Sequence, residues 1–419
     1  MKDLYLELLK EELVPALGCT EPIAIAYASA KAKEILGEFP EKITAICSGN
    51  IIKNVKGVIV PTTTDMKGIE TSAILGAVGG NPNKELQVLS DVLESDVLKT
   101  KELLKENFCD VLLKEGVENL YIEIVMTKEE NSSSVTISNS HTNIIEMKKN
   151  NEVIFKNEDV EENTNKIDRN FITIKGIYDY ITTCDTNTLK DLLDIQIKYN
   201  TEISEEGLNN NYGTNVGKTL IKAYGNRVEN LAKAYAASGS DARMSGSILP
   251  VVINSGSGNQ GLTVSMPVIV YAKDLKVSDE MLYRALALSN LVAIHIKTEI
   301  GKLSAFCGAV SASCGSGAAI AYLKGESYDV ITKTIINTLG TTSGIVCDGA
   351  KPSCAAKIAS SVDASIMAYY MAKEDNVFSP GEGLIKDDVE ETVKSICKMA
   401  REGMKETDIE ILNIMINKG

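Results

Sequence analysis

Three cysteines in the second half of the chain have the residue type and spacing best suited to metal chemistry. Cys307, Cys347 and Cys354 are separated by 40 and then 7 positions. Glycine, alanine and serine surround them, so little side-chain bulk is expected near the thiols. An iron–sulfur cluster would fill such a space, and glycine-rich turns can donate amides to its sulfurs. Three thiolates leave one iron of a [4Fe-4S] cluster open, and an open iron is a Lewis acid.

The same cysteines are also compatible with packing or with a different metal. Free cysteine is often a buried packing residue, and composition alone favours that role. A zinc site is less well supported, because structural zinc takes four ligands with a close cysteine pair, and only His141 and His295 are available to complete one. Cys314 follows Cys307 by seven residues in an expected glycine-rich turn and is an alternative ligand.

The helical and strand patterns around these residues predict an α+β fold. Residues 1–165 are expected to form an α+β part that contains an antiparallel sheet and binds the substrate, with its N-terminal helices packing either there or on the second part. Residues 166–419 are expected to form a mostly α-helical part that binds the cluster. The polar stretch 157–170 is the expected linker. Helices are expected at 4–13, 22–36, 71–78, 91–107, 189–201, 215–237, 279–300 and 331–339 and as a C-terminal pair, and strands at 42–47, 121–125, 134–137, 143–147 and 152–155.

Two glycine motifs resemble nucleotide-binding sequences. Residues 256–261 satisfy G-x-G-x-x-G after a strand-like segment, but β-branched residues and Pro267 follow where a helix is required. We therefore expect a tight turn there, or amides that face a small anion. Residues 213–219 have one residue too few between the glycines for a phosphate loop, and a helix start is the better interpretation.

Composition excludes several classes of partner. The net charge is -14, and aromatic residues make up 5% of the chain with no tryptophan, which argues against a nucleic-acid partner. The start of the chain has no secretion signal, and no apolar run is long enough to span a membrane. We expect a cytoplasmic protein without a membrane partner, whose nine cysteines are reduced, and a small polar substrate.

Five segments together resemble one enzyme family. They are residues 18–22, 48–54, 140–144 and 255–261 and the cysteine set 307, 347 and 354. The chain is similar over nearly its whole length to the iron–sulfur L-cysteine desulfidases, which are related to the iron–sulfur L-serine dehydratases. In the latter the last cysteine interval is longer and Gly-Pro follows Ser-His-Thr. Asn143 and Ile144 stand there in this chain, so the serine assignment is the weaker one.

The resemblance implies a β-elimination. L-cysteine would be converted to pyruvate, ammonia and hydrogen sulfide, with a [4Fe-4S] cluster held by Cys307, Cys347 and Cys354 and without pyridoxal phosphate. A positioned base must remove the Cα proton while the leaving group is stabilised.

The resemblance also assigns roles to polar residues of the first half. Cys19 at a helix start is the expected base or its proton partner, because a helix N-terminus lowers the pKa of a thiol, although a buried structural thiol is the plainer role. His141 would bind the substrate carboxylate or share the proton transfer, unless it is a structural side chain between strands. The expected substrate-binding residues are Ser48, Gly49, Asn50, Lys53, Asn54, Ser140, Thr142 and Asn143.

Simpler roles are open to some of these residues. Lys53 alone would be a solvated surface charge, and Ser140, Thr142 and Asn143 would cap a turn between strands. An L-serine ammonia-lyase is the alternative activity, and a metal or redox sensor is the alternative without catalysis. A homodimer is expected.

Overall fold

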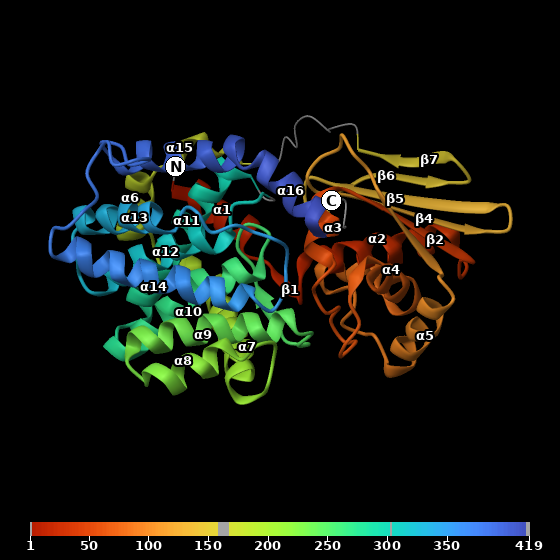
Figure 1. Cartoon of the computed structure of the whole chain (residues 1–419), viewed down its shortest axis with the longest axis horizontal. Helices are drawn as coiled ribbons and strands as arrows, with labels where there is room; N and C mark the ends of the chain where they lie inside the picture. The colour runs from red at the N-terminus through yellow and green to blue at the C-terminus, as the bar shows by residue number, and fades with distance from the viewer. Residues whose placement is uncertain (1, 158–166, 302–303, 416–419) are drawn as a thin grey trace.

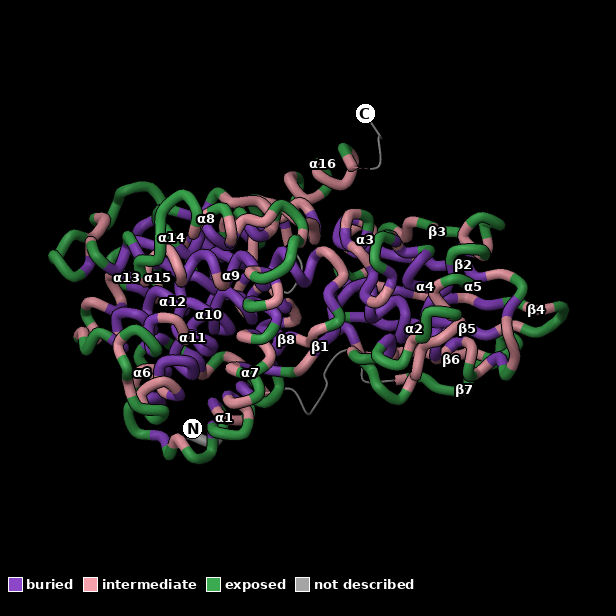
Figure 2. The backbone as a smooth tube through the Cα atoms, turned by 90° about the horizontal axis from the view of Figure 1, so that it is seen from below, coloured by how far each residue is buried: buried purple, intermediate pink, exposed green. Residues whose placement is uncertain are grey.

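The computed structural model describes residues 2–157, 167–301 and 304–415. Figure 1 shows two bodies side by side: a large helical body, and a smaller body in which helices cover one face of a sheet. Buried segments fill the interior of both bodies in Figure 2. The α+β fold class is confirmed. The predicted division at 165/166 lies within residues 158–166, outside the described residues, and stays a prediction.

The smaller body is built on a six-stranded sheet in the order β3-β2-β4-β5-β6-β7. Helices α2 and α4 pack on it and on each other, and isoleucines and alanines fill the space between helix and sheet. The bounds are α2 (Thr20–Leu36), β2 (Lys42–Cys47), α3 (Gly49–Val55), α4 (Gly68–Gly79), η1 (Pro82–Gln87), α5 (Glu94–Lys105), β3 (Cys109–Leu113), β4 (Tyr121–Lys128), β5 (Asn131–Ser138), β6 (Ile144–Lys149) and β7 (Glu152–Lys156).

The sheet is mixed, because β3 runs parallel to β2 while the other pairs are antiparallel. The sequence predicted β2 and β4–β7 but not β3. A parallel neighbour needs a long crossover, and α4 and α5 lie between β2 and β3 in the chain.

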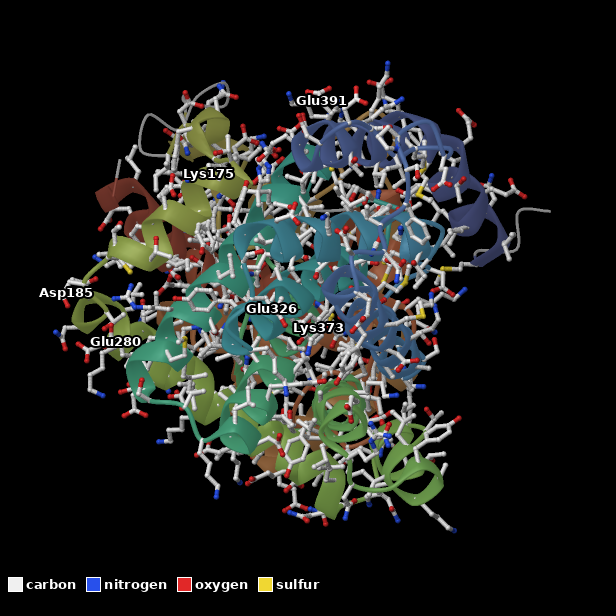
Figure 3. All side chains as sticks on the ribbon, turned by 90° about the vertical axis from the view of Figure 1, so that its left-hand side faces the viewer. Lys175, Asp185, Glu280, Glu326, Lys373 and Glu391 are labelled. Atoms are coloured by element: carbon white, nitrogen blue, oxygen red, sulfur yellow. The ribbon has the colours of Figure 1, made fainter. Side chains whose placement is uncertain are left out.

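The larger body surrounds the glycine- and alanine-rich helix α12, which packs against α10, α11, α13 and α14. Charged side chains such as Lys175, Glu280 and Lys373 are exposed on its outer end (Figure 3). The bounds are η2 (Arg169–Phe171), α6 (Ile174–Thr183), α7 (Asn187–Asn209), α8 (Val216–Tyr224), α9 (Val228–Met244), β8 (Pro250–Val252), α10 (Gly258–Leu275), α11 (Asp279–Ile300), α12 (Gly308–Leu323), α13 (Tyr328–Thr342), α14 (Cys354–Lys373), α15 (Val389–Lys398) and η3 (Met399–Gly403).

Each end of the chain contacts the body other than the one formed by its neighbouring sequence: the N-terminal elements pack on the larger body, and the C-terminal helix packs on the smaller one. Helix α1 (Lys2–Glu12) packs on α6, α7 and α11, and β1 (Pro15–Leu17) pairs with β8. Helix α16 (Lys405–Met415) leaves the helical body and packs on α3 (Figure 1). The core of the larger body therefore includes Tyr5, Leu8, Leu9, Leu13 and Ala16, whereas Leu17 belongs to the core of the smaller body.

Three sequence expectations in the helical body are wrong. Helix α10 does follow the glycine motif: Ser257 caps its N-terminus, and Pro267 lies inside it. Residues 311–317 belong to α12 rather than to a turn. The expected helix 215–237 is broken at Gly225, which has a φ of 77°. The predicted helix start near residue 215 is confirmed, since α8 begins at Val216.

In the part of the chain that the structure describes, no helix is both long enough and apolar enough to cross a bilayer.

Candidate active site

The three cysteines of the predicted cluster lie at one pocket, at the starts of two helices and the loop between them. Cys307 is the N-cap of α12, and Cys354 is the first residue of α14. Cys347 lies in the connection from α13 to α14. The backbone N–H of Cys347 donates to the carbonyl of Ala305 at 2.6 Å, and that of Cys307 donates to Ile345 at 3.1 Å. These bonds hold the two cysteine loops against each other.

We call this cavity of about 100 Å³ the thiol pocket. It is lined by the three cysteines and by residues of both bodies: Cys19, Glu21, Asn54, His141, Arg243, Ser255, Gly256, Ser257, Asn259, Gln260, Lys297, Ser304, Phe306, Cys307, Gly308, Ala309, Cys347, Gly349, Ala350, Cys354 and Ile358. The predicted ligands, the predicted base and His141 thus meet in one place.

The donor set of the thiol pocket fits an iron–sulfur cluster. All nine cysteines are free thiols, and those at 307, 347 and 354 are half-buried. Gly308 and Gly349 leave no room for a side chain: a Cβ on Gly308 would lie 2.6 Å from Cδ of Gln260, and one on Gly349 would meet the carbonyl of Lys53. Among the described residues, no three His, Cys, Asp or Glu side chains form a group that could hold a metal ion. A cluster does not need the three cysteines to surround one metal ion, because each cysteine binds its own iron.

Burial keeps the Cys307 and Cys354 thiols protonated in the absence of a cation. It raises the pKa of Cys307 to about 12, with a further contribution from Cys347, and it raises the pKa of Cys354 as well. Since a metal binds the thiolate, loading would have to displace these protons.

Cys19 lies at the predicted helix start, but its thiol is not acidic. It is the N-cap of α2 and donates to Oε2 of Glu21 at 3.1 Å. Burial and the neighbouring Glu21 carboxylate raise its pKa well above the ordinary value. The expectation that the helix N-terminus lowers this pKa is therefore wrong, because desolvation and a like charge outweigh the helix dipole.

Glu21 is a pocket residue that the sequence patterns did not single out. Its side chain is 8% exposed. Asn54 donates to its Oε1 at 3.1 Å, and Thr20 donates to its Oε2 at 3.1 Å. Burial alone would raise the pKa of Glu21, yet His141 and the hydrogen bond from Cys19 lower it overall. Glu21 is therefore ionised at neutral pH. The sequence offered one indication of this role, because Glu21 lies in the first turn of a helix directly after Cys19 and Thr20.

Two buried cations of the pocket were also missed. Arg243 of α9 is 2% exposed, and its Nε donates to the carbonyl of Gly18 at 2.8 Å. Lys297 of α11 is 4% exposed, and burial lowers its pKa to about 8. Both lie inside long helical patterns, which do not distinguish them from surface charges.

His141 lies on the loop between β5 and β6 and is shared by two cavities. It is buried, and a Cβ on Gly256 would lie 3.2 Å from its Cε1. With Ser140 and Thr142 it also lines a larger cleft of about 650 Å³ beside α1. Asn143 donates to the carbonyl of Ser138 at 2.9 Å, so it caps the turn, which is the simpler of its two predicted roles.

Most of the segment 48–54 lies at a different cavity. Ser48, Gly49, Asn50 and Lys53 line a cavity of about 660 Å³ beside α16, which we call the α16 pocket. There Ser48 Oγ donates to the carbonyl of Asn119 at 2.7 Å. Of this segment, only Asn54 lines the thiol pocket.

The charge on Lys53 is paired within the protein. Its side chain is 1% exposed and forms an ion pair with Asp408 of α16. Asn50 Nδ2 also donates to Asp408, at 2.9 Å. The surface role that Lys53 would have alone is therefore wrong.

The remaining cysteines belong to hydrophobic cores or the sheet. Cys314 is fully buried in the middle of α12 and packs in the main core. It does not line the thiol pocket, so the alternative in which it replaces a ligand is not supported. Cys397 is buried on α15 and packs in the main core.

The fold and the thiol pocket agree with what comparison with known proteins shows. The serine dehydratase alpha chain family matches residues 83–413, and the chain belongs to this family. It is 52% identical over 412 residues to a UPF0597 protein of Lachnoclostridium phytofermentans, covering 98% of this chain and 99% of the relative. It is 52% identical over 415 residues to one of Finegoldia magna, covering 99% of each. The predicted kinship with serine dehydratases is confirmed, and the desulfidase assignment stays a prediction.

Proposed function

We propose that this protein is a [4Fe-4S]-dependent lyase that converts L-cysteine and water to pyruvate, ammonia and hydrogen sulfide. One observation carries the proposal: three half-buried thiols of the helical body share a pocket with Cys19, Glu21 and His141. Metal ligands and proton-transfer groups next to a small cavity are what such an elimination requires.

Cys307, Cys347 and Cys354 would hold the cluster. When bound, it would supply an open iron that acts as a Lewis acid on the substrate. The rest of the work falls to side chains of the protein. Glu21 and His141 are buried, which strengthens the electrostatic interaction between them.

Removal of the proton from the substrate Cα is assigned to the group formed by Cys19, Glu21 and His141. Cys19 can accept a proton only as a thiolate, and the raised pKa of Cys19 together with the lowered pKa of Glu21 disfavours transfer of its proton to that carboxylate. His141 is the alternative base, with Glu21 stabilising its protonated form. Loss of the Cα proton and of hydrosulfide gives an enamine, which water converts to pyruvate and ammonia.

L-serine is the second candidate substrate, because the matching family is that of serine dehydratase alpha chains. Sulfide release from L-cysteine and pyruvate formation from L-serine should be compared on one anaerobic preparation. We expect the higher kcat/KM with L-cysteine, and a clear preference for L-serine would overturn the substrate assignment.

The cluster is tested by chemical analysis. Protein purified without oxygen should contain iron and acid-labile sulfide, and Cys307→Ser, Cys347→Ser and Cys354→Ser should each lose most of both. Cys184→Ser is the matched control, since Cys184 is a core thiol that does not line the thiol pocket. Equal iron in wild type and all three variants would overturn the cluster and favour the sensor or packing alternatives.

The proposal also covers the biological unit. We expect a cytoplasmic homodimer that acts on a free amino acid and has no nucleic-acid partner. Light scattering on the purified protein checks the dimer, and a monomeric mass would contradict it.

A further inference from the structure

Gln260 is a buried glutamine of the thiol pocket whose side-chain amide has no hydrogen-bond partner among the described residues. It lies in the first turn of α10, is 5% exposed and lines the cavity. Its Oε1 is fully buried and unbonded, and its only hydrogen bond to a side chain is made by its backbone N–H. Buried amide groups normally have their hydrogen bonds made, so an exception at the wall of a cavity indicates that a ligand makes them.

The sequence places Gln260 where a helix cap would use its side chain. Ser257 is the N-cap of α10, and the two residues have the S-x-x-Q spacing of a capping box. One half of the box is present, because Ser257 Oγ accepts from the backbone N–H of Gln260 at 3.4 Å. The other half is replaced, since the N–H of Ser257 donates to the carbonyl of Asn254 at 3.0 Å. The side chain of Gln260 is therefore not used by the cap and is available to the pocket.

The glycines of this motif hold the turn close to the rest of the site. A Cβ on Gly261 would meet the carbonyl of Val252 in β8, and one on Gly258 would meet Nε of Arg243. Only glycine allows so close an approach of backbone at these two positions. The motif thus seats the start of α10 against β8 and determines where Gln260 lies.

The amide of Gln260 lies beside the first of the three cluster cysteines. A Cβ on Gly308 would lie 2.8 Å from Nε2 of Gln260, so the amide packs against the backbone of Gly308. Gly308 directly follows Cys307, the N-cap of α12. The thiolates and sulfides of an iron–sulfur cluster accept hydrogen bonds and have none to donate. An amide N–H without a partner in the protein is complementary to such a sulfur.

We propose that the side-chain amide of Gln260 donates a hydrogen bond to a sulfur at the Cys307 corner of the cluster and stabilises the bound cluster. This inference rests on the proposed function for the presence of the cluster. A donor to sulfur offsets negative charge, and a reduced cluster carries more negative charge than an oxidised one. Loss of the donor should therefore lower the reduction potential and let the cluster dissociate faster.

The variant Gln260→Leu removes the donor and keeps an apolar side chain in its place. In protein purified without oxygen we expect a lower reduction potential in a titration followed by electron paramagnetic resonance. Iron release to a chelator should be about tenfold faster than in wild type, the order of effect expected for one hydrogen bond to a charged group.

The matched control is Asn337→Leu. Asn337 is a fully buried carboxamide of α13 that does not line the thiol pocket, and its hydrogen bonds join it to the backbone of Asn376 and Phe378. This variant should keep the wild-type potential and rate of iron release.

Thermal melts of the iron-free protein separate a role toward the cluster from a structural role. Because the Gln260 amide bonds to no described residue, Gln260→Leu should melt at or above the wild-type temperature. Asn337→Leu should melt at a lower temperature, since it breaks two hydrogen bonds of the fold. If Gln260→Leu does not fold, Gln260→Met takes its place.

The inference is overturned if the potential of Gln260→Leu does not fall, if its iron release is not faster, or if Asn337→Leu changes both to the same extent. A folded Gln260→Leu protein that retains no cluster, when Asn337→Leu retains it, supports the inference. Failure of the proposed function has a different signature. Wild-type protein without iron removes the cluster and the inference together, whereas a loaded protein that shows the expected pattern but releases neither sulfide nor pyruvate loses the activity alone.

Discussion

The thiol pocket and the α16 pocket differ in the partners of their buried polar and charged side chains. In the α16 pocket, Lys53 pairs with Asp408, and Asn50 donates to the same carboxylate. In the thiol pocket, Glu21 accepts hydrogen bonds from Cys19, Thr20 and Asn54, whereas Asn54 Oδ1 is buried and has no hydrogen-bond partner among the described residues. A paired buried charge is compatible with a structural role, whereas unpaired groups around a cavity indicate a place for a ligand.

The same short segment serves both pockets. Helix α3 has only seven residues, and consecutive residues of a helix point in directions about 100° apart. Lys53 and Asn54 are neighbours in sequence, but Lys53 faces α16 and Asn54 faces the thiols. The sequence segment 48–54 therefore does not form a single site but contributes residues to both pockets.

The largest expected effect that tests this comparison is in the thiol pocket. Glu21→Gln keeps the shape of the side chain but removes the charge next to Cys19, His141 and Asn54. We expect turnover to fall by about 100-fold or more, because the charge that stabilises the protonated form of His141 is lost, with iron content unchanged. Steady-state kinetics on the anaerobic protein measures this.

The control for Glu21 is Glu70→Gln, since Glu70 is an exposed acid in the first turn of α4. Turnover of Glu21→Gln at the wild-type rate would remove Glu21 from the catalytic group.

A smaller effect, of another kind, is expected in the α16 pocket. Asp408→Asn leaves Lys53 buried without its counter-charge, so the free energy of unfolding should fall by about 1–3 kcal/mol. Turnover by the folded variant should stay within about twofold of wild type. Denaturant titration and kinetics measure the two quantities, and Glu410→Gln serves as an exposed control on the same helix.

A loss of turnover in Asp408→Asn as large as that in Glu21→Gln would show that the two pockets form one functional unit, against the distinction drawn between them.

The smallest effect is expected at Cys314, which lies on the same helix as Cys307 but inside the core. Cys314→Ala should lower the free energy of unfolding by about 1 kcal/mol through lost packing, and iron and sulfide content should not change. Metal analysis and a denaturant titration check this. Loss of iron would instead make Cys314 a ligand.

Much of the architecture could be predicted from the sequence because its signals are local. The charged helical pattern of α1, the alternation in β4–β7 and the strand β2 are all present. Helix α10 was missed because its β-branched residues and Pro267 disfavour a helix locally, while burial of nearly the whole helix stabilises it in the folded protein. Glycine and serine likewise concealed α12, whose close packing requires small residues.

The site could be predicted only in part for a related reason. Cys19, Asn54, His141 and the three cluster cysteines were singled out by type and by likeness to a family, and the structure brings them together. Glu21, Arg243 and Lys297 were not, since a charged side chain in a helix gives no sign of whether it faces solvent or a cavity. Only three-dimensional packing distinguishes these cases.

The thiol pocket joins residues from opposite ends of the polypeptide. Cys19 and Cys354 are 335 positions apart, so the cavity cannot close until the ribosome has produced most of the chain. An inorganic cofactor held by Cys307, Cys347 and Cys354 can therefore gain its last ligand only after the start of α14 has been synthesised. A nascent or truncated polypeptide that ends before α14 lacks one wall of the cavity, and it would present its cysteines to oxidants without the protection that the completed molecule provides.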